Sequence, residues 1–330
     1  MLEKKVSIKL LNIIVYLLFL LIKHNNISKE WIKYGFNPVL GNSKTGSLFD
    51  PFVLRHQGIY KMYVSWRSKG SIALSISKDG IKWSEPKTVL EKGNSKSWES
   101  NINRASVVLL NEKMYLWYTG QYKGKSEIGF AISDDGNTFI KYKYNPVMKP
   151  EYEFEKKSVM NPHVIYDKDE KIFKMWYAAG ETYEPDVICY ALSKDGINWI
   201  KYNKNPIFIP NSNTFSYDFF KIGGCDVHKI SKTKYLMFYI GYSDIDTARI
   251  FVAESNNGIN NWKRSNHPII QPTKGQFDNN ACYKPSAIFN RNNNKWLLWY
   301  NGRNKNLELI GLAIHNNYRI YNYKDFLNHE

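Results

Sequence analysis

The chain has 330 residues and a formal net charge of +16, and its residues are 43% hydrophobic and 15% aromatic. This length fits two average domains or one large β domain, and the hydrophobic content is sufficient for a real core. The basic balance favours an anionic partner such as an acidic glycan, a phosphate-bearing substrate or a membrane surface. Nucleic acid is not predicted as a partner, because the sequence has no Lys/Arg run, zinc pattern or RNA-recognition signature.

The N-terminal stretch, residues 1–24, is basic and then strongly apolar. Its uninterrupted apolar part, residues 13–22, is shorter than a standard membrane-spanning helix, and no small-residue cleavage site follows it. Four polar residues fall near one side of a helix, namely Lys9, Asn12, Tyr16 and Lys23. We therefore predict an amphipathic or anchor helix over residues 1–30, with peripheral contact between residues 1–24 and anionic lipid. This predicts a cytoplasmic protein associated with the inner membrane; a helix packed on the body is the alternative.

From Trp31 onward the sequence repeats with a period of roughly 60 residues, the length of a four-stranded antiparallel blade with modest loops. Each copy has an apolar strand rich in aromatic residues, such as FKMWYAAG at 173–180. In four copies a turn and an aromatic residue follow, as in SKDGINW ending at Trp199, and in three of these an Asn-Pro or His-Pro pair comes next, as at 205–207. Alternating apolar residues bounded by Asp-Gly and Pro predict strands joined by tight turns.

The fifth copy, residues 282–313, lacks the ending made of a turn, an aromatic residue and proline. That ending stands instead at the other end of the chain, from Trp31 to Val39. The N-terminal segment is therefore expected to supply the outer strand of the last blade and close the ring, which removes open sheet edges. We predict an all-β fold, a five-bladed β-propeller over residues 31–315, followed by a tail over 316–330. A β-sandwich is the alternative.

The three cysteines, Cys189, Cys225 and Cys282, lie inside strand-like runs at spacings that match no metal or redox motif. We predict buried free thiols, which suit a reducing compartment. The sequence predicts neither a metal nor an organic cofactor.

In a propeller the first strand of each blade lines the central channel, and ligands bind at one mouth of that channel. Aligning these strands brings one polar residue from each blade to the same position: Asp50, Arg104, Asn161, Asp226 and Lys284. His163 and His228 lie two residues further along their strands and therefore on the same face. Two carboxylates, an amide and two cations that converge at one mouth predict a binding or catalytic site.

The repeats resemble those of the five-bladed propeller glycoside hydrolases, the group that contains invertase, levansucrase and arabinanase (families 32, 68 and 43). They are also similar to uncharacterised relatives found with polysaccharide-biosynthesis genes. In these enzymes an Asp before Pro on the first blade is the nucleophile or general base, so the resemblance implies that role for Asp50, which precedes Pro51. The chain departs from the pattern on blade three, where Asn161 replaces a second Asp. On blade four it lacks the acid Glu, and Asp226 is the nearest carboxylate.

Glycosyl transfer needs two carboxyl groups that flank the anomeric carbon, one of them protonated. Asp50 is the first candidate. For the acid the sequence offers Asp226, by alignment, and Glu181 in the loop GETYEP, where Tyr183 and Pro185 could shield a carboxyl group from solvent. A solvated turn residue is the plain alternative for Glu181.

The residues predicted to bind substrate are Trp66, Arg67, Arg104, Asn161, His163, His228, Tyr283, Lys284 and Arg303. The Arg and Lys side chains among them suit a carboxylate or phosphate on the substrate, with salt bridges between blades as the alternative. Glu99, Glu155 and Asp278 each follow an aromatic residue at the entry to a blade, and this recurrence indicates a structural role.

We therefore predict a glycosidase-like enzyme that cleaves or transfers a glycosyl unit of an oligo- or polysaccharide, anionic glycans included. A bacterial surface polysaccharide or its precursor is the expected substrate. A glycosyltransferase in capsule or lipopolysaccharide assembly is one alternative. A glycan-binding propeller without catalysis is another, because two of the carboxylates expected from the resemblance are missing.

Overall fold

The structure is a computed structural model that describes residues 31–291 and 293–316. These residues form twenty strands and one short 3₁₀ helix, η1 (Glu153–Glu155), so the predicted all-β class is confirmed. The helix predicted over residues 1–30, its membrane contact and the tail beyond Asn316 lie outside the described residues. Within the described ranges, no helix is long and apolar enough to cross a membrane.

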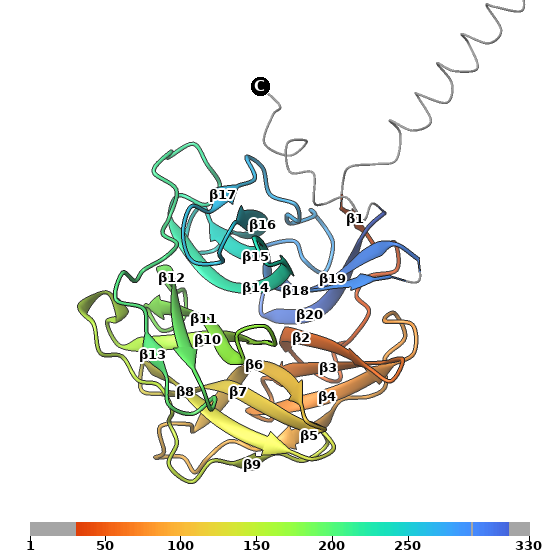
Figure 1. The fold of residues 1–330 in the computed structure, drawn as a ribbon. Coiled ribbons are helices and arrows are strands. Elements are labelled where there is room, and N and C mark those ends of the chain that lie inside the picture. The colour runs from red at the N-terminus through yellow and green to blue at the C-terminus, as the bar shows by residue number, and fades with distance from the viewer. Residues whose placement is uncertain (1–30, 292, 317–330) are drawn as a thin grey trace, which may run out of the picture.

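The strands form five four-stranded antiparallel units arranged in a ring (Figure 1). The first unit contains β2 (Leu48–His56), β3 (Ile59–Trp66), β4 (Ser71–Ser77) and β5 (Lys87–Leu90), and the second contains β6 (Asn101–Leu110), β7 (Lys113–Tyr122), β8 (Lys125–Ser133) and β9 (Ile140–Lys141). The third contains β10 (Ser158–Asp167), β11 (Ile172–Gly180), β12 (Val187–Ser193) and β13 (Ile200–Lys201). The fourth contains β14 (Lys221–Ser231), β15 (Lys234–Tyr242), β16 (Ala248–Ser255) and β17 (Lys263–Arg264). The fifth contains β18 (Ala281–Asn290), β19 (Lys295–Asn304), β20 (Leu307–His315) and, from the start of the described chain, β1 (Ile32–Lys33). A single parallel pair between β8 and β10 joins the second and third units into one sheet.

The N-terminal segment completes the fifth unit, as the displaced repeat ending predicts. Strand β1 pairs antiparallel with β20, beside which it lies in Figure 1. Asn37 extends this pairing, because its side chain donates to the Leu312 carbonyl at 2.9 Å and accepts from the Leu312 N–H at 2.8 Å. Asn145 and Asn205 make the same two hydrogen bonds with the third strands of their own units. The repeated Asn-Pro pair therefore continues the outer edge of a sheet with a side chain.

A buried or partly buried carboxylate, a tyrosine hydroxyl and a cation form a lock that recurs in four units. Asp278 is fully buried, accepts a hydrogen bond from the Tyr300 hydroxyl at 2.9 Å and pairs with Lys33 of β1. The other locks are Glu99 with Tyr118 and Lys141, Glu155 with Tyr177 and Lys201, and Asp218 with Tyr239 and Arg264. The structural role predicted for Glu99, Glu155 and Asp278 is confirmed. Each lock ties an outer strand to the second strand of its unit.

The turns after the third strands tie each unit to its neighbour. Gly80 lies at φ +77°, its carbonyl accepts the indole N–H of Trp299 at 2.8 Å, and an added Cβ would lie 2.8 Å from that ring. Trp117 and Trp176 make equivalent bonds to the carbonyls of Gly196 and Gly258. Five apolar clusters fill the spaces between successive units, so both faces of each sheet are buried, which accounts for the high aromatic content. The three cysteines are buried free thiols, as predicted.

Replacing Asp278 should destabilise the whole domain. Asp278→Asn removes the charge that pairs with Lys33, and breaking a buried ion pair from one side typically costs about 3 kcal/mol. We expect a lower midpoint in urea denaturation followed by tryptophan fluorescence. Lys44→Met, which removes an exposed lysine from the same segment, should leave the midpoint unchanged. A wild-type midpoint for Asp278→Asn would contradict the role of this lock in closing the ring.

Candidate active site

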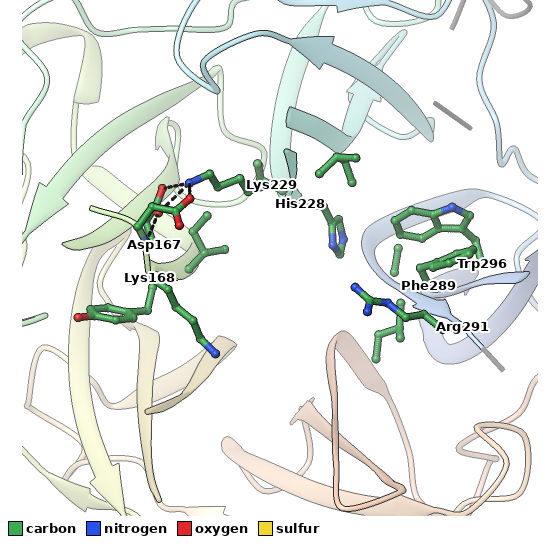
Figure 2. A pocket seen from close by; sticks show the side chains of 14 residues that line it. Asp167, Lys168, His228, Lys229, Phe289, Arg291 and Trp296 are labelled. Carbon is green, nitrogen blue, oxygen red and sulfur yellow. Dashed lines mark hydrogen bonds and ion pairs between the residues drawn. The ribbon is translucent and has the colours of Figure 1, made fainter. Parts of the chain in front are cut away.

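The inner strands β2, β6, β10, β14 and β18 surround the centre of the ring (Figure 1). A cavity lies at each end of these strands. The mouth pocket, of about 430 Å³, lies where these strands begin. The base cavity, of about 560 Å³, lies where they end (Figure 2). Six of the twelve predicted site residues line the mouth pocket: Asp50, Arg67, Arg104, Asn161, Tyr283 and Arg303.

A β-bulge near the start of every inner strand shapes this pocket, because the register of each antiparallel pair shifts there. Four of the bulges hold non-glycine residues at positive φ, with φ values of 52°, 59°, 52° and 36° for Asp50, Arg104, Asn161 and Lys284. This backbone conformation costs of order 1–3 kcal/mol for such residues and is retained mainly where it positions functional groups. The polar residues that the strand alignment brings together therefore share one local backbone geometry.

The fourth unit departs from the predicted alignment. The register of β14 shifts between Ile222 and Cys225, so Gly223 corresponds to Asp50, and the placement of Asp226 at the mouth is wrong by three residues. An added Cβ at Gly224 would lie 2.8 Å from the Asn161 side chain, so glycine leaves room for that amide. Asp226 lies deeper in the ring and does not line the mouth pocket.

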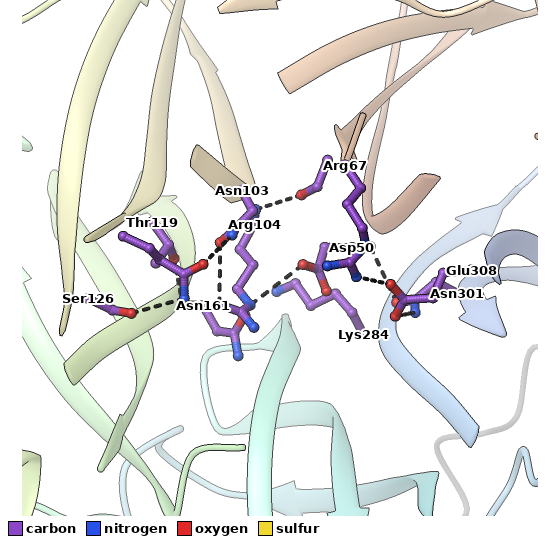
Figure 3. Close-up of polar contacts among 12 residues, drawn as sticks. Asp50, Arg67, Asn103, Arg104, Thr119, Ser126, Asn161, Lys284, Asn301 and Glu308 are labelled. Atoms are coloured by element: carbon purple, nitrogen blue, oxygen red, sulfur yellow. Dashed lines mark hydrogen bonds and ion pairs between the residues drawn. The ribbon is translucent and has the colours of Figure 1, made fainter. Parts of the chain in front are cut away.

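Asp50 is the buried carboxylate at the centre of the mouth pocket (Figure 3). Its backbone N–H donates to Asn301 Oδ1 at 3.3 Å. Its Oδ2 lies 3.5 Å from Arg104 Nε but has no hydrogen-bond partner among the described residues. Burial raises the pKa of Asp50, although the charges of Arg104, Lys284 and Arg67 act to lower it. A buried carboxylate oxygen without a donor is a place where a ligand hydroxyl or water can bind.

Cationic groups surround this carboxylate. Lys284 is 1% exposed beneath the pocket and donates to the Cys225 carbonyl at 3.3 Å, and burial lowers the pKa of its ammonium group. Arg104 also donates to Asn103 Oδ1, while Arg303 donates to the Asp246 carbonyl. Asn161 Oδ1 is a second buried oxygen without a hydrogen-bond partner in the described part of the chain. The pocket therefore offers unused acceptors within a positive field.

Two carboxyl groups that the sequence analysis did not select, Glu184 and Glu308, also line the mouth pocket. Glu308 is buried, pairs with Arg67 and accepts from Asn301 Nδ2 at 3.3 Å. Glu184 is half-buried, and its side chain is hydrogen-bonded to Tyr242. Burial raises the pKa of both glutamates. The mouth pocket therefore contains three carboxyl groups that burial makes easier to protonate.

The loop GETYEP was a usable signal, because it contains Glu184 as well as the predicted Glu181. Glu181 is exposed and pairs with Lys156 at 2.9 Å, so it does not line the mouth pocket. Glu308 had a weaker signal, since it lies opposite Arg303 in the ladder between β19 and β20. Its burial depends on Arg67 from another unit, which no local pattern reports.

Three further predicted residues lie away from the mouth. Trp66 packs on the cluster between the fifth and first units and donates its indole N–H to the Thr45 carbonyl at 2.9 Å. His163 is buried with its Nε2 2.9 Å from the Val227 carbonyl, and burial lowers its pKa to about 4. His228 lines the base cavity. Both histidines lie deeper along the ring than the mouth pocket, and His228 was placed at the mouth because Asp226 was misaligned.

The sequence is similar to proteins that act on glycosides. The family model described as "Glycosyl hydrolases family 32 N-terminal domain" matches residues 75–218. An uncharacterised protein of Mycobacterium tuberculosis is 24% identical over 276 residues, which cover 78% of this chain and 88% of that protein. A 1,2-beta-oligomannan phosphorylase of a Thermoanaerobacter species is 28% identical over 162 residues. That match covers 46% of this chain and 45% of the phosphorylase.

Solved structures share the fold. A thermostable family-43 glycoside hydrolase has a TM-score of 0.67 at 18% identity, with 84% of this chain and 91% of that chain covered. A beta-1,2-mannobiose phosphorylase from Listeria innocua, in complex with beta-1,2-mannobiose, has a TM-score of 0.67 at 14% identity. That likeness covers 87% of this chain and 97% of the phosphorylase. The resemblance to the propeller glycoside hydrolases that the repeats predict is confirmed.

Asp50→Asn should stabilise the protein at neutral pH. Because burial raises the pKa of Asp50, the folded state binds this proton more tightly than the unfolded chain does. Stability is therefore lost as the pH rises from the unfolded pKa, about 4, through the higher folded value. Asn carries no charge and avoids that loss, so its urea midpoint should exceed that of the wild type at pH 7 and converge with it near pH 4.

Asp134→Asn is the control for this comparison, because Asp134 is 87% exposed. The urea midpoint of Asp134→Asn should equal that of the wild type at both pH 7 and pH 4. A midpoint for Asp50→Asn that is equal to or below the wild type at pH 7 would contradict the proposed cost of ionising Asp50.

Proposed function

We propose that the mouth pocket binds an oligosaccharide and cleaves or transfers one of its glycosyl units. The observation that carries this proposal is Asp50, a buried carboxyl group with a raised pKa and an oxygen that lacks a donor among the described residues. It faces a cavity of about 430 Å³. A perturbed carboxyl group in a concave pocket with converging polar groups is typical of an active site. The family-model match and the relatives named as phosphorylases support the assignment.

The chemistry needs a proton donor for the departing glycosidic oxygen and a group that assists attack on the anomeric carbon. We assign the donor to Glu184, since burial raises its pKa and it forms no ion pair within the described residues. Asp50 lies within ion-pair distance of Arg104, and the positive charge of Arg104 favours the ionised carboxylate of Asp50 during the reaction. Asp50 is then the base for a water or sugar acceptor, or the carboxylate that faces positive charge on the ring. The acid thus comes from the predicted loop, three residues after Glu181.

A second candidate acceptor is inorganic phosphate. Three arginines and a lysine line the mouth pocket, namely Arg67, Arg104, Arg303 and Lys305, and Lys284 lies beneath it. Such a field suits a dianion. A phosphate oxygen would attack the anomeric carbon as the glycosidic C–O bond breaks, and the leaving oxygen would take the proton from Glu184. The product would be a sugar 1-phosphate, and no carboxylate base would be needed.

The wider context is part of the same proposal. The five units would be the blades of one five-bladed propeller domain over residues 31–315, preceded by a helix over residues 1–30 that contacts the inner membrane from the cytoplasm. The substrate would be a surface polysaccharide or its precursor, and a transferase in capsule or lipopolysaccharide assembly would use the same pocket with a sugar acceptor. The basic N-terminal sequence and the charge of +16 support this placement.

Asp50→Asn and Glu184→Gln should each reduce turnover by about 10²–10⁴-fold, the usual size of a general acid–base contribution. Glu181→Gln, in the same loop but outside the pocket, should retain wild-type turnover. The measurement is chromatographic release of monosaccharide from β-1,2-linked manno-oligosaccharides and from acidic and furanose-containing glycans. Wild-type turnover by Asp50→Asn would exclude a catalytic role for Asp50. Glycan binding by the wild type without turnover of any of these glycans would favour the non-catalytic alternative.

Phosphate should accelerate turnover and appear in the product if phosphate is the acceptor. Arg104→Gln should then raise the KM for phosphate about tenfold or more, because a hydrogen bond to a charged group is typically worth about 1.5–3 kcal/mol. Phosphorus NMR of the reaction mixture detects the sugar 1-phosphate. Release of free sugar at one rate with and without phosphate would identify water as the acceptor.

A further inference from the structure

The base cavity lies at the opposite end of the inner strands from the mouth pocket, and the proposed glycosyl chemistry does not use it (Figure 2). It is about 560 Å³ in volume and is formed by the ends of β10, β14 and β18 together with Trp296 of β19. The two cavities share no lining residue. A ligand in the base cavity would therefore be recognised by a separate set of side chains.

The carboxylates of the base cavity are already paired with lysines. Asp167 is buried and pairs with both Lys174 and Lys229 at 2.8 Å, and Asp169 also pairs with Lys229 at 2.9 Å. Burial opposes ionisation of Asp167, but these ammonium groups lower its pKa, so the carboxylate is charged at neutral pH. Lys174 also pairs with Glu170 at 2.6 Å, so three carboxylates share two ammonium groups and none of these lysines is free for a ligand.

Two cations at the cavity have no such compensation. Lys168 and Arg291 line the cavity, and Figure 2 shows both directed toward its open centre. Neither forms a hydrogen bond or an ion pair within the part of the chain that the structure describes. Two positive charges that face one cavity and have no ion-pair partner in this part of the chain favour an anionic ligand. The planar fork of a guanidinium group matches two oxygens of a phosphoryl group.

A histidine that also lines the cavity supplies a third polar group with a fixed orientation. His228 Nε2 lies 2.9 Å from Asp226 Oδ2, and the same oxygen accepts the Ala287 N–H at 2.6 Å. These contacts lower the pKa of Asp226 to about 2 against the effect of burial, so the carboxylate is ionised and holds a proton on Nε2. Nδ1 then has no partner among the described residues. Edge-on contact with Trp296, at 5.4 Å between ring centroids, fixes the imidazole plane.

We propose that the base cavity is a second ligand site, for a small molecule that bears a phosphoryl group. Arg291 and Lys168 bind the phosphoryl oxygens, and Nδ1 of His228 bonds to the same group or to a neighbouring hydroxyl. The charge of the two cations matches a phosphate monoester better than a single carboxylate. The cavity volume leaves room for an attached sugar-sized group beside Tyr166 and Phe289. Asp226 and His228, selected from the sequence for the mouth, belong to this site.

Isothermal titration of the full chain with inorganic phosphate and with glucose 6-phosphate tests this proposal, with glucose and glucuronate as the uncharged and carboxylate comparisons. The double variant Lys168→Gln/Arg291→Gln should weaken glucose 6-phosphate binding by about tenfold or more, given the strength of charge-assisted hydrogen bonds. His228→Asn should weaken it by a smaller factor. Inorganic phosphate alone should bind more weakly than the ester, because it leaves the rest of the cavity unfilled.

Lys232→Gln is the matched control, since it removes one exposed charge at the end of β14 without lining the cavity. It should leave the affinity unchanged, and Arg104→Gln should identify any binding at the mouth. Equal losses in Lys232→Gln and the double variant would reduce the effect to general charge screening and overturn the proposal. Binding that only Arg104→Gln abolishes would also overturn the proposal. Glucuronate binding as tight as that of glucose 6-phosphate would overturn it too. These outcomes concern binding alone, so they do not depend on the proposed glycosyl chemistry.

Discussion

The contact between Lys33 and Asp278 holds the first described strand against the last unit, and the other units depend on that closure. Strand β1 has only two residues, so its pairing with β20 is reinforced by side chains at and beyond its C-terminal end. Lys33 reaches the buried Asp278, and Asn37 pairs with the backbone of Leu312. Each sheet packs its two faces against neighbouring sheets, so an open ring would expose the faces on either side of the gap. The structure therefore predicts cooperative loss of the whole ring rather than of one sheet.

The same closure assembles the mouth pocket. Asp50 and Arg67 come from the first unit, whereas Asn301 and Glu308 come from the fifth, and both pairs of contacts cross the closing interface. The pocket keeps a carboxylate buried and four bulge residues at positive φ, and both features oppose folding. The locks within units and the hydrogen bonds from tryptophan to glycine between units stabilise the folded state away from the pocket. This stabilisation offsets the cost of the buried carboxylate and of the positive φ angles. Rigid units therefore present a strained and highly charged centre, as proposed for a glycosyl-processing site.

Most of the fold could be predicted from the sequence because its motifs have local physical causes. Asn37-Pro38 repeats an element that hydrogen-bonds a neighbouring strand. Because this element stands near the N-terminus instead of after the fifth copy, the sequence predicted that the N-terminal segment closes the ring. The site could be predicted only in part. A bulge adds a residue without changing the polar pattern of a strand. The bulge in β14 holds two glycines and no polar residue, so the alignment matched Asp50 with Asp226, whereas the structure matches it with Gly223. Loop conformation, which no period encodes, decides that Glu184 rather than Glu181 faces the pocket.

The central claim is that Asp50 faces the glycosidic bond of a bound oligosaccharide. The most direct measurement is a crystal structure of Asp50→Asn soaked with a manno-oligosaccharide or another glycan that the wild type turns over. The account predicts a sugar ring in the mouth pocket, with the glycosidic oxygen within hydrogen-bond reach of Glu184 and the anomeric carbon next to residue 50. A glycan bound only on the outer surface or in the base cavity, with the mouth pocket empty, would contradict it.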